Sequence, residues 1–330
     1  MQTNAMQNWT KWCCLIFAFF LVSCEENSLW VGKKEFFTVK YNNQYGTPSV
    51  SSEPWSQSPF ISVNQISTRN NGNGVVQIIA DGIRIQSESR NYEIDTVTVF
   101  ERKGNKFIIQ DEFNNSRTSS RTDIAAVLVL DMSTSLGDLV DNLKEYAKSF
   151  VEKVASSTPN SKVAVVFFSG KNDIQETRFF GSSDYSLLND LINNYSNYQS
   201  RTALFQATSR GLTLLDNLNF KGSKALVVFT DGGDNDSNNP DKLESDIQKS
   251  DHLRISIGLK GKDLDKNNIE SIADSKSNAI IANKSEQLKS IFETVAKQVV
   301  SVYTLIYERS DQITSDEIEI KFEIEVDKIK

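Results

Sequence analysis

The sequence is poor in the residues that mark several common classes of protein. Its 330 residues include five prolines, fifteen glycines, one histidine and three cysteines. So little glycine and proline excludes a collagen-like or proline-rich chain. No apolar run approaches the ~20 residues that a membrane-spanning helix needs. The formal net charge of −7 makes long-range attraction to nucleic acid unfavourable.

The cysteines all lie near the N-terminus, where the sequence predicts an export signal. Residues 25–330 contain no cysteine, so they cannot form a disulfide. The apolar run 12–22 follows Lys11 and is too short to span a membrane, which is typical of a signal peptide. The junction Leu21-Val22-Ser23-Cys24 resembles the lipobox of bacterial lipoproteins.

That resemblance implies that residues 1–23 are a lipoprotein signal peptide and that Cys24 carries the lipid. The expected location is the cell envelope, most naturally the outer membrane or cell surface of a Gram-negative bacterium. An ordinary secretory signal with a chance cysteine is the alternative, but no Ala-x-Ala cleavage site ends the run.

Residues 24–121 predict a small antiparallel β-domain followed by a polar linker. Asp81-Gly82 and Gly104-Asn105 each separate two apolar runs and predict hairpin turns, because glycine tolerates a positive φ. The predicted strands are 36–41, 75–79, 83–86, 97–100 and 107–109.

Residues 122–300 predict an α/β domain. The unbroken apolar run 124–130 is typical of a central parallel strand that is covered on both faces. Apolar residues then recur every three or four positions over 136–154, which indicates an amphipathic helix. Strands and helices alternate from there to residue 300. This order predicts a doubly wound parallel sheet with helices on both faces.

Residues 301–330 return to a strand pattern. Between 317 and 326 charged and apolar side chains alternate strictly, so one face of a strand is apolar. We expect these C-terminal strands to pack on the N-terminal β-domain, which would make the α/β domain an insertion.

A cluster of oxygen donors is expected at the carboxyl edge of the parallel sheet. The motif Asp131-Met132-Ser133-Thr134-Ser135 follows the central strand directly, where folds of this class bind ligands. One carboxylate and two hydroxyls in a tight loop can converge on a hard cation. Alternatively, the serines cap the next helix.

Two further segments strengthen the metal-site prediction. Thr202 opens a predicted helix, and Asp231 follows another buried strand. In this order the three segments resemble the von Willebrand factor type A (vWA) domain and its metal-ion-dependent adhesion site (MIDAS). The resemblance covers about residues 122–300 and implies a Rossmann-like vWA fold beside the β-domain.

By that resemblance, Ser133 and Ser135 would bind the metal directly, and Thr202 directly or through water. Asp131 and Asp231 would act largely through water. The implied ion is Mg²⁺, with Mn²⁺ or Ca²⁺ as alternatives. Hydroxyls and waters leave much of the ion's charge uncompensated, so an open coordination position can attract a partner's carboxylate.

Neighbouring charges complete the expected site. Ser200-Arg201 stands where many family members have Gly-Gly or Gly-x before the threonine, and Arg201 could pair with an incoming acid. Asp234 and Asp236 are interpreted as solvated loop acids, and the sole histidine, His252, as a surface residue.

The expected function is therefore a lipid-anchored envelope protein that binds an acidic group of a protein or other ligand, without catalysis. A structural scaffold subunit with a vestigial or stabilising metal site is the alternative. A metal-assisted hydrolase is a third hypothesis, although no general base with a clear sequence context accompanies the motif. No nucleotide-binding or activated-serine motif is present, so nucleotide and nucleic-acid partners are not expected.

Overall fold

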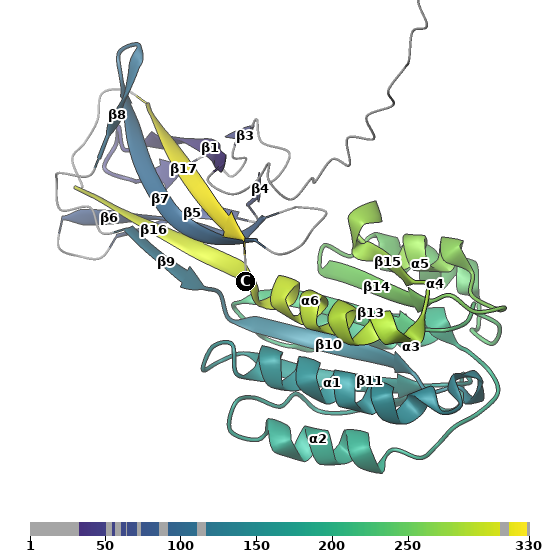
Figure 1. The fold of residues 1–330 in the computed structure, drawn as a ribbon. Helices are drawn as coiled ribbons and strands as arrows, with labels where there is room; N and C mark the ends of the chain where they lie inside the picture. The colour runs from purple at the N-terminus through teal and green to yellow at the C-terminus, as the bar shows by residue number, and fades with distance from the viewer. Residues whose placement is uncertain are drawn as a thin grey trace, which may run out of the picture.

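A computed structural model describes residues 33–50, 55–56, 61–63, 65–70, 74–85, 92–110, 117–310 and 317–328 (Figure 1). The expected signal peptide and Cys24 lie outside these residues. None of the helices in the described part of the chain is long and apolar enough to cross a membrane.

A six-stranded sheet forms the centre of the α/β domain, in the order β12-β11-β10-β13-β14-β15. Five strands are parallel, and the short edge strand β12 is antiparallel to β11. The strands are β10 (Ile124–Asp131), β11 (Lys162–Phe168), β12 (Gln175–Glu176), β13 (Ser223–Thr230), β14 (Leu253–Leu259) and β15 (Ala279–Ala282).

Helices cover both faces of this sheet, which confirms the predicted doubly wound fold. On one face lie α1 (Leu139–Ala155), α2 (Tyr185–Asn194) and α6 (Leu288–Val300). On the other lie α3 (Leu204–Asn217), α4 (Pro240–Gln248) and α5 (Lys266–Ile272). Short 3₁₀ turns complete the domain: η2 (Thr134–Leu136), η3 (Lys276–Asn278) and η4 (Ser285–Gln287).

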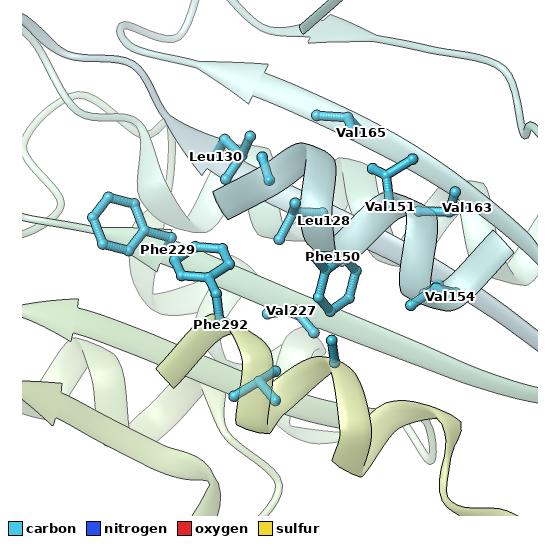
Figure 2. Close-up of a cluster of buried hydrophobic side chains, with 14 of the residues drawn as sticks. Leu128, Leu130, Phe150, Val151, Val154, Val163, Val165, Val227, Phe229 and Phe292 are labelled. Carbon is cyan, nitrogen blue, oxygen red and sulfur yellow. The ribbon is translucent and has the colours of Figure 1, made fainter. Parts of the chain in front are cut away.

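The central strand β10 shows why the chain folds in this way. All eight of its residues are buried, and successive side chains point to opposite faces. Leu128 and Leu130 pack under α1 and α6 against Phe150 and Phe292 (Figure 2), whereas Val127 packs under α3. A continuous apolar run was needed because neither face of this strand meets water.

Two antiparallel sheets form the β-domain around a second core. One has the order β2-β1-β17-β7-β8, with β3 paired to β1, and the other has the order β4-β6-β16-β9, with β5 paired to β6. The first contains β1 (Lys33–Asn42), β2 (Ser49–Val50), β3 (Trp55–Ser56), β7 (Tyr92–Lys103), β8 (Lys106–Ile109) and β17 (Ile318–Lys328). The second contains β4 (Ile61–Ser62), β5 (Gln65–Asn70), β6 (Val75–Ile85), β9 (Arg117–Arg121) and β16 (Val302–Ser310).

The C-terminal strands occupy inner positions in both sheets. β17 lies between β1 and β7, and β16 lies between β6 and β9. Their apolar side chains, among them Tyr307 and Phe322, join the β-domain core with Phe37. The chain enters the α/β domain from β9 and leaves it through β16, and these two strands are paired to each other (Figure 1).

One hairpin prediction is confirmed and one is wrong. β7 and β8 form a hairpin that turns at Gly104, where φ is +59°. The other predicted turn, Asp81-Gly82, lies inside the continuous strand β6. There the register against β16 shifts beside Thr304, and Gly82 has a φ of +68°. The dipeptide forms a bulge, which requires the same positive φ as a turn.

Candidate metal centre

The predicted site residues lie where the strand order of the parallel sheet reverses. β10 and β13 are neighbours at this point, and their connections run to opposite sides of the sheet. Asp131 is the last residue of β10, and Asp231 directly follows β13. Open α/β sheets bind ligands at this kind of switch point.

Hydrogen bonds join the two serines to both acids. The backbone amide of Ser133 donates to Asp131 Oδ1 at 2.9 Å. Ser133 Oγ lies 2.9 Å from Ser135 Oγ, and Ser135 Oγ donates to Asp231 Oδ1 at 3.0 Å. The Ser133 side chain makes no capping bond to η2. The helix-capping interpretation is therefore wrong for Ser133, and the serine hydroxyls belong to the cluster.

Thr202 lies near the same cluster but comes from a different segment of the chain. It precedes α3 and is 5% exposed. A Cβ atom placed on Gly232 would lie 3.6 Å from Thr202 Oγ1, so this hydroxyl faces the turn that carries Asp231. Segments that are far apart in the sequence thus bring three hydroxyls and two carboxylates to one edge.

Thr230 belongs to the cluster and was not predicted from the sequence. It is fully buried at the end of β13, and its hydroxyl donates to Asp131 Oδ2 at 2.6 Å while accepting from the Gly232 amide at 3.0 Å. With the bond from Ser133, this contact orients both oxygens of the Asp131 carboxylate. The pattern Thr-Asp at a buried strand's end was the available signal.

The two acids lie in an unfavourable electrostatic environment. Asp131 is fully buried, and this burial raises its pKa to about 7 despite the hydrogen bonds from Thr230 and Ser133. Burial also raises the pKa of Asp231. In the described part of the chain, no Lys, Arg or His forms a salt bridge with either acid. A bound cation would offset this unfavourable negative charge.

The donor set fits a hard divalent cation. Adjacent oxygens around an octahedral ion with bonds of ~2.0–2.1 Å lie about 2.8–3.0 Å apart. Ser133 Oγ and Ser135 Oγ, the two predicted direct ligands, are 2.9 Å apart. The residues described here contain no group of three or more His, Cys, Asp or Glu side chains that could hold a metal. Ligation at this edge would therefore depend on hydroxyls, which suit oxygen-preferring ions such as Mg²⁺.

The charged residues beside the site contact neighbouring groups. Arg201, predicted to be available to a ligand, is 69% exposed and pairs with Asp236 at 2.8 Å. The interpretation of Asp236 as a solvated acid is wrong, because its side chain is only 8% exposed. Asp234 is also engaged, since Oδ1 accepts from the Phe205 amide at 3.2 Å and from Ser237 Oγ at 2.5 Å. Ser237 is a local partner, whereas Arg201 and Phe205 are 35 and 29 positions away from the acids they contact, which sequence spacing could not reveal.

His252 directly precedes β14, at the opposite edge of the sheet from the cluster. Its Nε2 is 2.8 Å from Asp216 Oδ1, and its side chain is 20% exposed. It borders a hollow of about 450 Å³ between α3 and α4.

These features define an open α/β domain with an oxygen-donor site at its topological switch point. The chain belongs to the von Willebrand factor type A domain family, whose model matches residues 126–294, just over half of the chain. The family assignment based on the three motifs is thereby confirmed.

The chain is also similar to individual proteins. Over 174 residues the chain is 26% identical to the uncharacterized protein YwmC of Bacillus subtilis (strain 168), covering 48% of this chain and 76% of YwmC. Proximal thread matrix protein 1 from the mussel byssus, in a structure with a zinc-occupied MIDAS motif, has a TM-score of 0.48 at 20% identity, covering 58% of this chain and 50% of that one.

The pilus adhesin SpaC from Lactobacillus rhamnosus GG in its open conformation has a TM-score of 0.48 at 10% identity. That match covers 87% of this chain and 50% of SpaC. The chain thus spans about half the length of both of these solved structures.

Proposed function

We propose that this protein is a lipid-anchored binding protein of the cell envelope. In this proposal its vWA domain holds Mg²⁺ and binds an acidic group on a protein partner or another ligand. The proposal rests on one observation. Ser133, Ser135 and Thr202 lie at the same edge of the sheet as two acids that have no basic partner among the described residues.

The predicted site residues would have different roles, which depend on how deeply each is buried. Ser133 Oγ, Ser135 Oγ and Thr202 Oγ1 would hold the ion. Asp131 is fully buried and tied by Thr230, so its charge would act on the ion's inner face. Ser135 is exposed, so the outer face is open to a ligand. A bound divalent ion would supply positive charge and an open coordination position for an incoming carboxylate.

Arg201 would lie at the rim of this site. It forms its salt bridge with Asp236 through Nη1, and most of its side chain is exposed to solvent. A guanidinium carries five N–H donors in a fork, so the remaining donors could engage a second acidic group of the ligand. Arg201→Ala would then weaken binding of a ligand with two acidic groups more than that of a ligand with one.

The anchor in this proposal rests on the sequence alone. The apolar run 12–22 and the lipobox-like junction at Cys24 support lipid attachment and an envelope location. Mass spectrometry of the protein purified from bacterial membranes would detect a diacylglyceryl group on Cys24. A processed protein that carries no lipid would contradict the anchor and leave the metal site unaffected.

Titration calorimetry with Mg²⁺ tests the site directly. We expect one Mg²⁺ per chain for the wild-type protein and none for Asp131→Ala. Asp246→Ala is the matched control, because Asp246 is an exposed acid on α4 that pairs with Lys242 and Lys249. Equal binding by all three proteins would contradict the proposed site.

Ligand binding is tested with envelope extract passed over immobilised protein in Mg²⁺, followed by elution with EDTA. We expect eluted proteins from the wild-type column and not from the Asp131→Ala column. Capture that is indifferent to both changes would instead favour the scaffold hypothesis. Turnover of phosphate esters by the purified protein would contradict a purely binding function.

A further inference from the structure

The segment that carries Thr202 has no regular secondary structure. It runs through residues 195–203, between the end of α2 and the start of α3, and we call it the Thr202 segment. The backbone bonds that hold it come from outside the segment. The Thr134 amide donates to Gln199 O at 2.9 Å, and the Ala203 amide donates to Ser169 O at 2.7 Å. The position of the Thr202 hydroxyl therefore depends on neighbouring loops.

The loop after β13 supplies the contacts at Thr202 itself. The Thr202 amide donates to Asn235 Oδ1 at 2.9 Å. The Thr202 carbonyl accepts from the amides of Asn235 and Asp236 at 2.9 and 3.2 Å. Both peptide groups of Thr202 are thus bound to one short stretch of a different loop, the loop that begins with Asp231.

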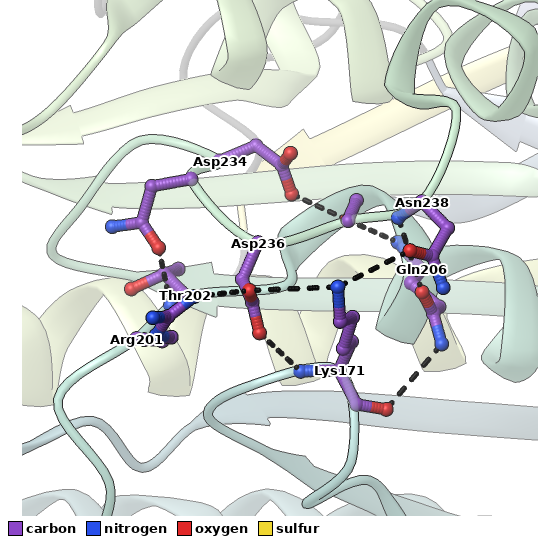
Figure 3. A network of polar contacts seen from close by, with 9 residues as sticks. Lys171, Arg201, Thr202, Gln206, Asp234, Asp236 and Asn238 are labelled. Carbon is purple, nitrogen blue, oxygen red and sulfur yellow. Dashed lines mark hydrogen bonds and ion pairs between the residues drawn. The ribbon is translucent and has the colours of Figure 1, made fainter.

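Asp236 connects this arrangement to a third loop. Its carboxylate accepts from Arg201 Nη1 at 2.8 Å and from the Lys171 backbone amide at 2.9 Å (Figure 3). The Lys171 ammonium lies 4.0 Å from the same carboxylate. A Cβ atom on Gly170 would be only 3.1 Å from Asp236 Oδ2, so glycine at this position leaves room for the contact.

We propose that Asp236 is a positioning residue for the metal site, although it is not itself a ligand. Together with Arg201 and Lys171 it forms what we call the Asp236 clamp. The clamp joins the loops after β11 and β13 to the Thr202 segment and so holds Thr202 beside Asp231. This inference rests on the proposed function, because it concerns the same metal site.

If Asp236 acted on the metal site only through its negative charge, the variants would show a different pattern of Mg²⁺ affinities. Asp236→Asn removes a negative charge, so it would weaken Mg²⁺ binding under either explanation. The two explanations predict opposite effects of Arg201→Ala on Mg²⁺ affinity. If charge alone mattered, loss of a positive group near the site would strengthen Mg²⁺ binding. If the clamp matters, the same change removes one of the bonds on Asp236 and weakens binding.

The first test compares amide hydrogen exchange in EDTA, so it needs no bound metal. The full chain is compared as wild type, Asp236→Asn and Arg201→Ala, with Asp246→Asn as control because it also removes a carboxylate bound by two basic groups. We expect amides 202 and 203 to exchange at least about tenfold faster in Asp236→Asn and less markedly faster in Arg201→Ala. The α1 amides should not change in any variant. Unchanged protection of 202 and 203 in both clamp variants would overturn the proposal.

The second test measures Mg²⁺ affinity in the same four proteins. Loss of a residue that orients a ligand typically weakens metal binding by about 10- to 100-fold. We expect about tenfold weaker binding for Asp236→Asn, a smaller loss for Arg201→Ala and no change for Asp246→Asn. Tighter binding by Arg201→Ala would overturn the clamp in favour of the charge effect. If the wild type binds no Mg²⁺, the proposed function fails, and the exchange experiment still decides whether Asp236 holds Thr202.

Discussion

Asp131 is the residue at which burial and charge conflict most strongly. Its side chain is fully buried, and this burial raises its pKa to about 7. An unfolded aspartate has a pKa of about 4, so the metal-free folded protein retains a proton that the unfolded chain loses as pH rises from about 4 to 7. The contribution of Asp131 to the free energy of unfolding is therefore most favourable at low pH and is lost as pH approaches 7.

The same proton competes with a metal ion, which gives a pH-dependent prediction. Below pH 7, we expect the apparent Mg²⁺ affinity to fall by up to about tenfold per pH unit, because the Asp131 carboxyl must release its proton on binding. Above pH 7 the affinity should level off. Calorimetry at pH 6, 7 and 8, in buffers of different ionisation enthalpy, would measure both affinity and proton release. Equal affinity at pH 6 and pH 8 would show that Asp131 does not titrate with binding.

Residue types alone predicted the donors but not their neighbours. Ser133, Ser135 and Asp231 contact one another, in agreement with the proximity expected from their places at strand ends. Asp236 was assigned wrongly because Arg201, its partner, lies 35 positions away in a different loop. Local spacing carries no information about such a contact.

At the scale of elements, α3 positions the Thr202 segment through close packing on the sheet. Gly211 lies in the middle of α3, facing β10 and β13. A Cβ atom there would come within 2.7 Å of Leu226 Cδ1 and 2.9 Å of Val129 Cγ2. The helix can approach the strands this closely because residue 211 has no side chain.

Gly211→Ala should therefore destabilise the protein even though alanine favours helix formation. We expect overpacking to cost about 1–3 kcal/mol, against a gain of up to about 1 kcal/mol from helix propensity. Urea unfolding of the purified protein measures the balance. Thr213→Ala, at an exposed position of the same helix, is the control and should raise the free energy of unfolding by up to about 0.7 kcal/mol, because alanine favours the helix more than threonine does. A more stable Gly211→Ala protein would show that α3 is not tightly packed here.

The helices and strands that were predicted most accurately are those with the largest buried apolar surface. The apolar run 124–130 and the amphipathic pattern after it correspond to β10 and α1, because both have a large apolar surface to cover. The helix α4 was missed, since it is short and mostly polar and buries only Ile247 fully. The Asp81-Gly82 turn was wrong because a bulge and a hairpin use the same residue types.

At the scale of the whole molecule, the C-terminal strands β16 and β17 pair with strands from the N-terminal part of the chain. β17 and β16 each lie between two other strands, so their removal would separate β1 from β7 and β6 from β9. It would also remove Phe322, Ile324 and Tyr307 from the core of the β-domain. The α/β domain has separate cores on the two faces of its own sheet.

Deletion of residues 301–330 should therefore abolish cooperative unfolding of the β-domain and leave that of the α/β domain. Scanning calorimetry of the full and shortened chains would detect the loss of one transition. A chain that ends at residue 328 keeps both strands and serves as the control. Two preserved transitions after the larger deletion would contradict this dependence.

The sequence by itself determined the class of each part of the chain. The continuous apolar run, the alternating helices and strands, and the ordered Asp131, Thr202 and Asp231 motifs are local patterns. They follow from the period of each element and from the rule that parallel strands end at one edge. These features required no knowledge of which loop packs on which.

Only the tertiary structure decided how the site is assembled and supported. The bond from Thr230 to Asp131 spans 99 positions of the sequence, and that from Arg201 to Asp236 spans 35. Such contacts arise because burial of the two faces of the sheet brings distant loops together, and a short window of sequence does not contain that information. The chemistry of the donors is local, whereas the geometry that makes them a site is not.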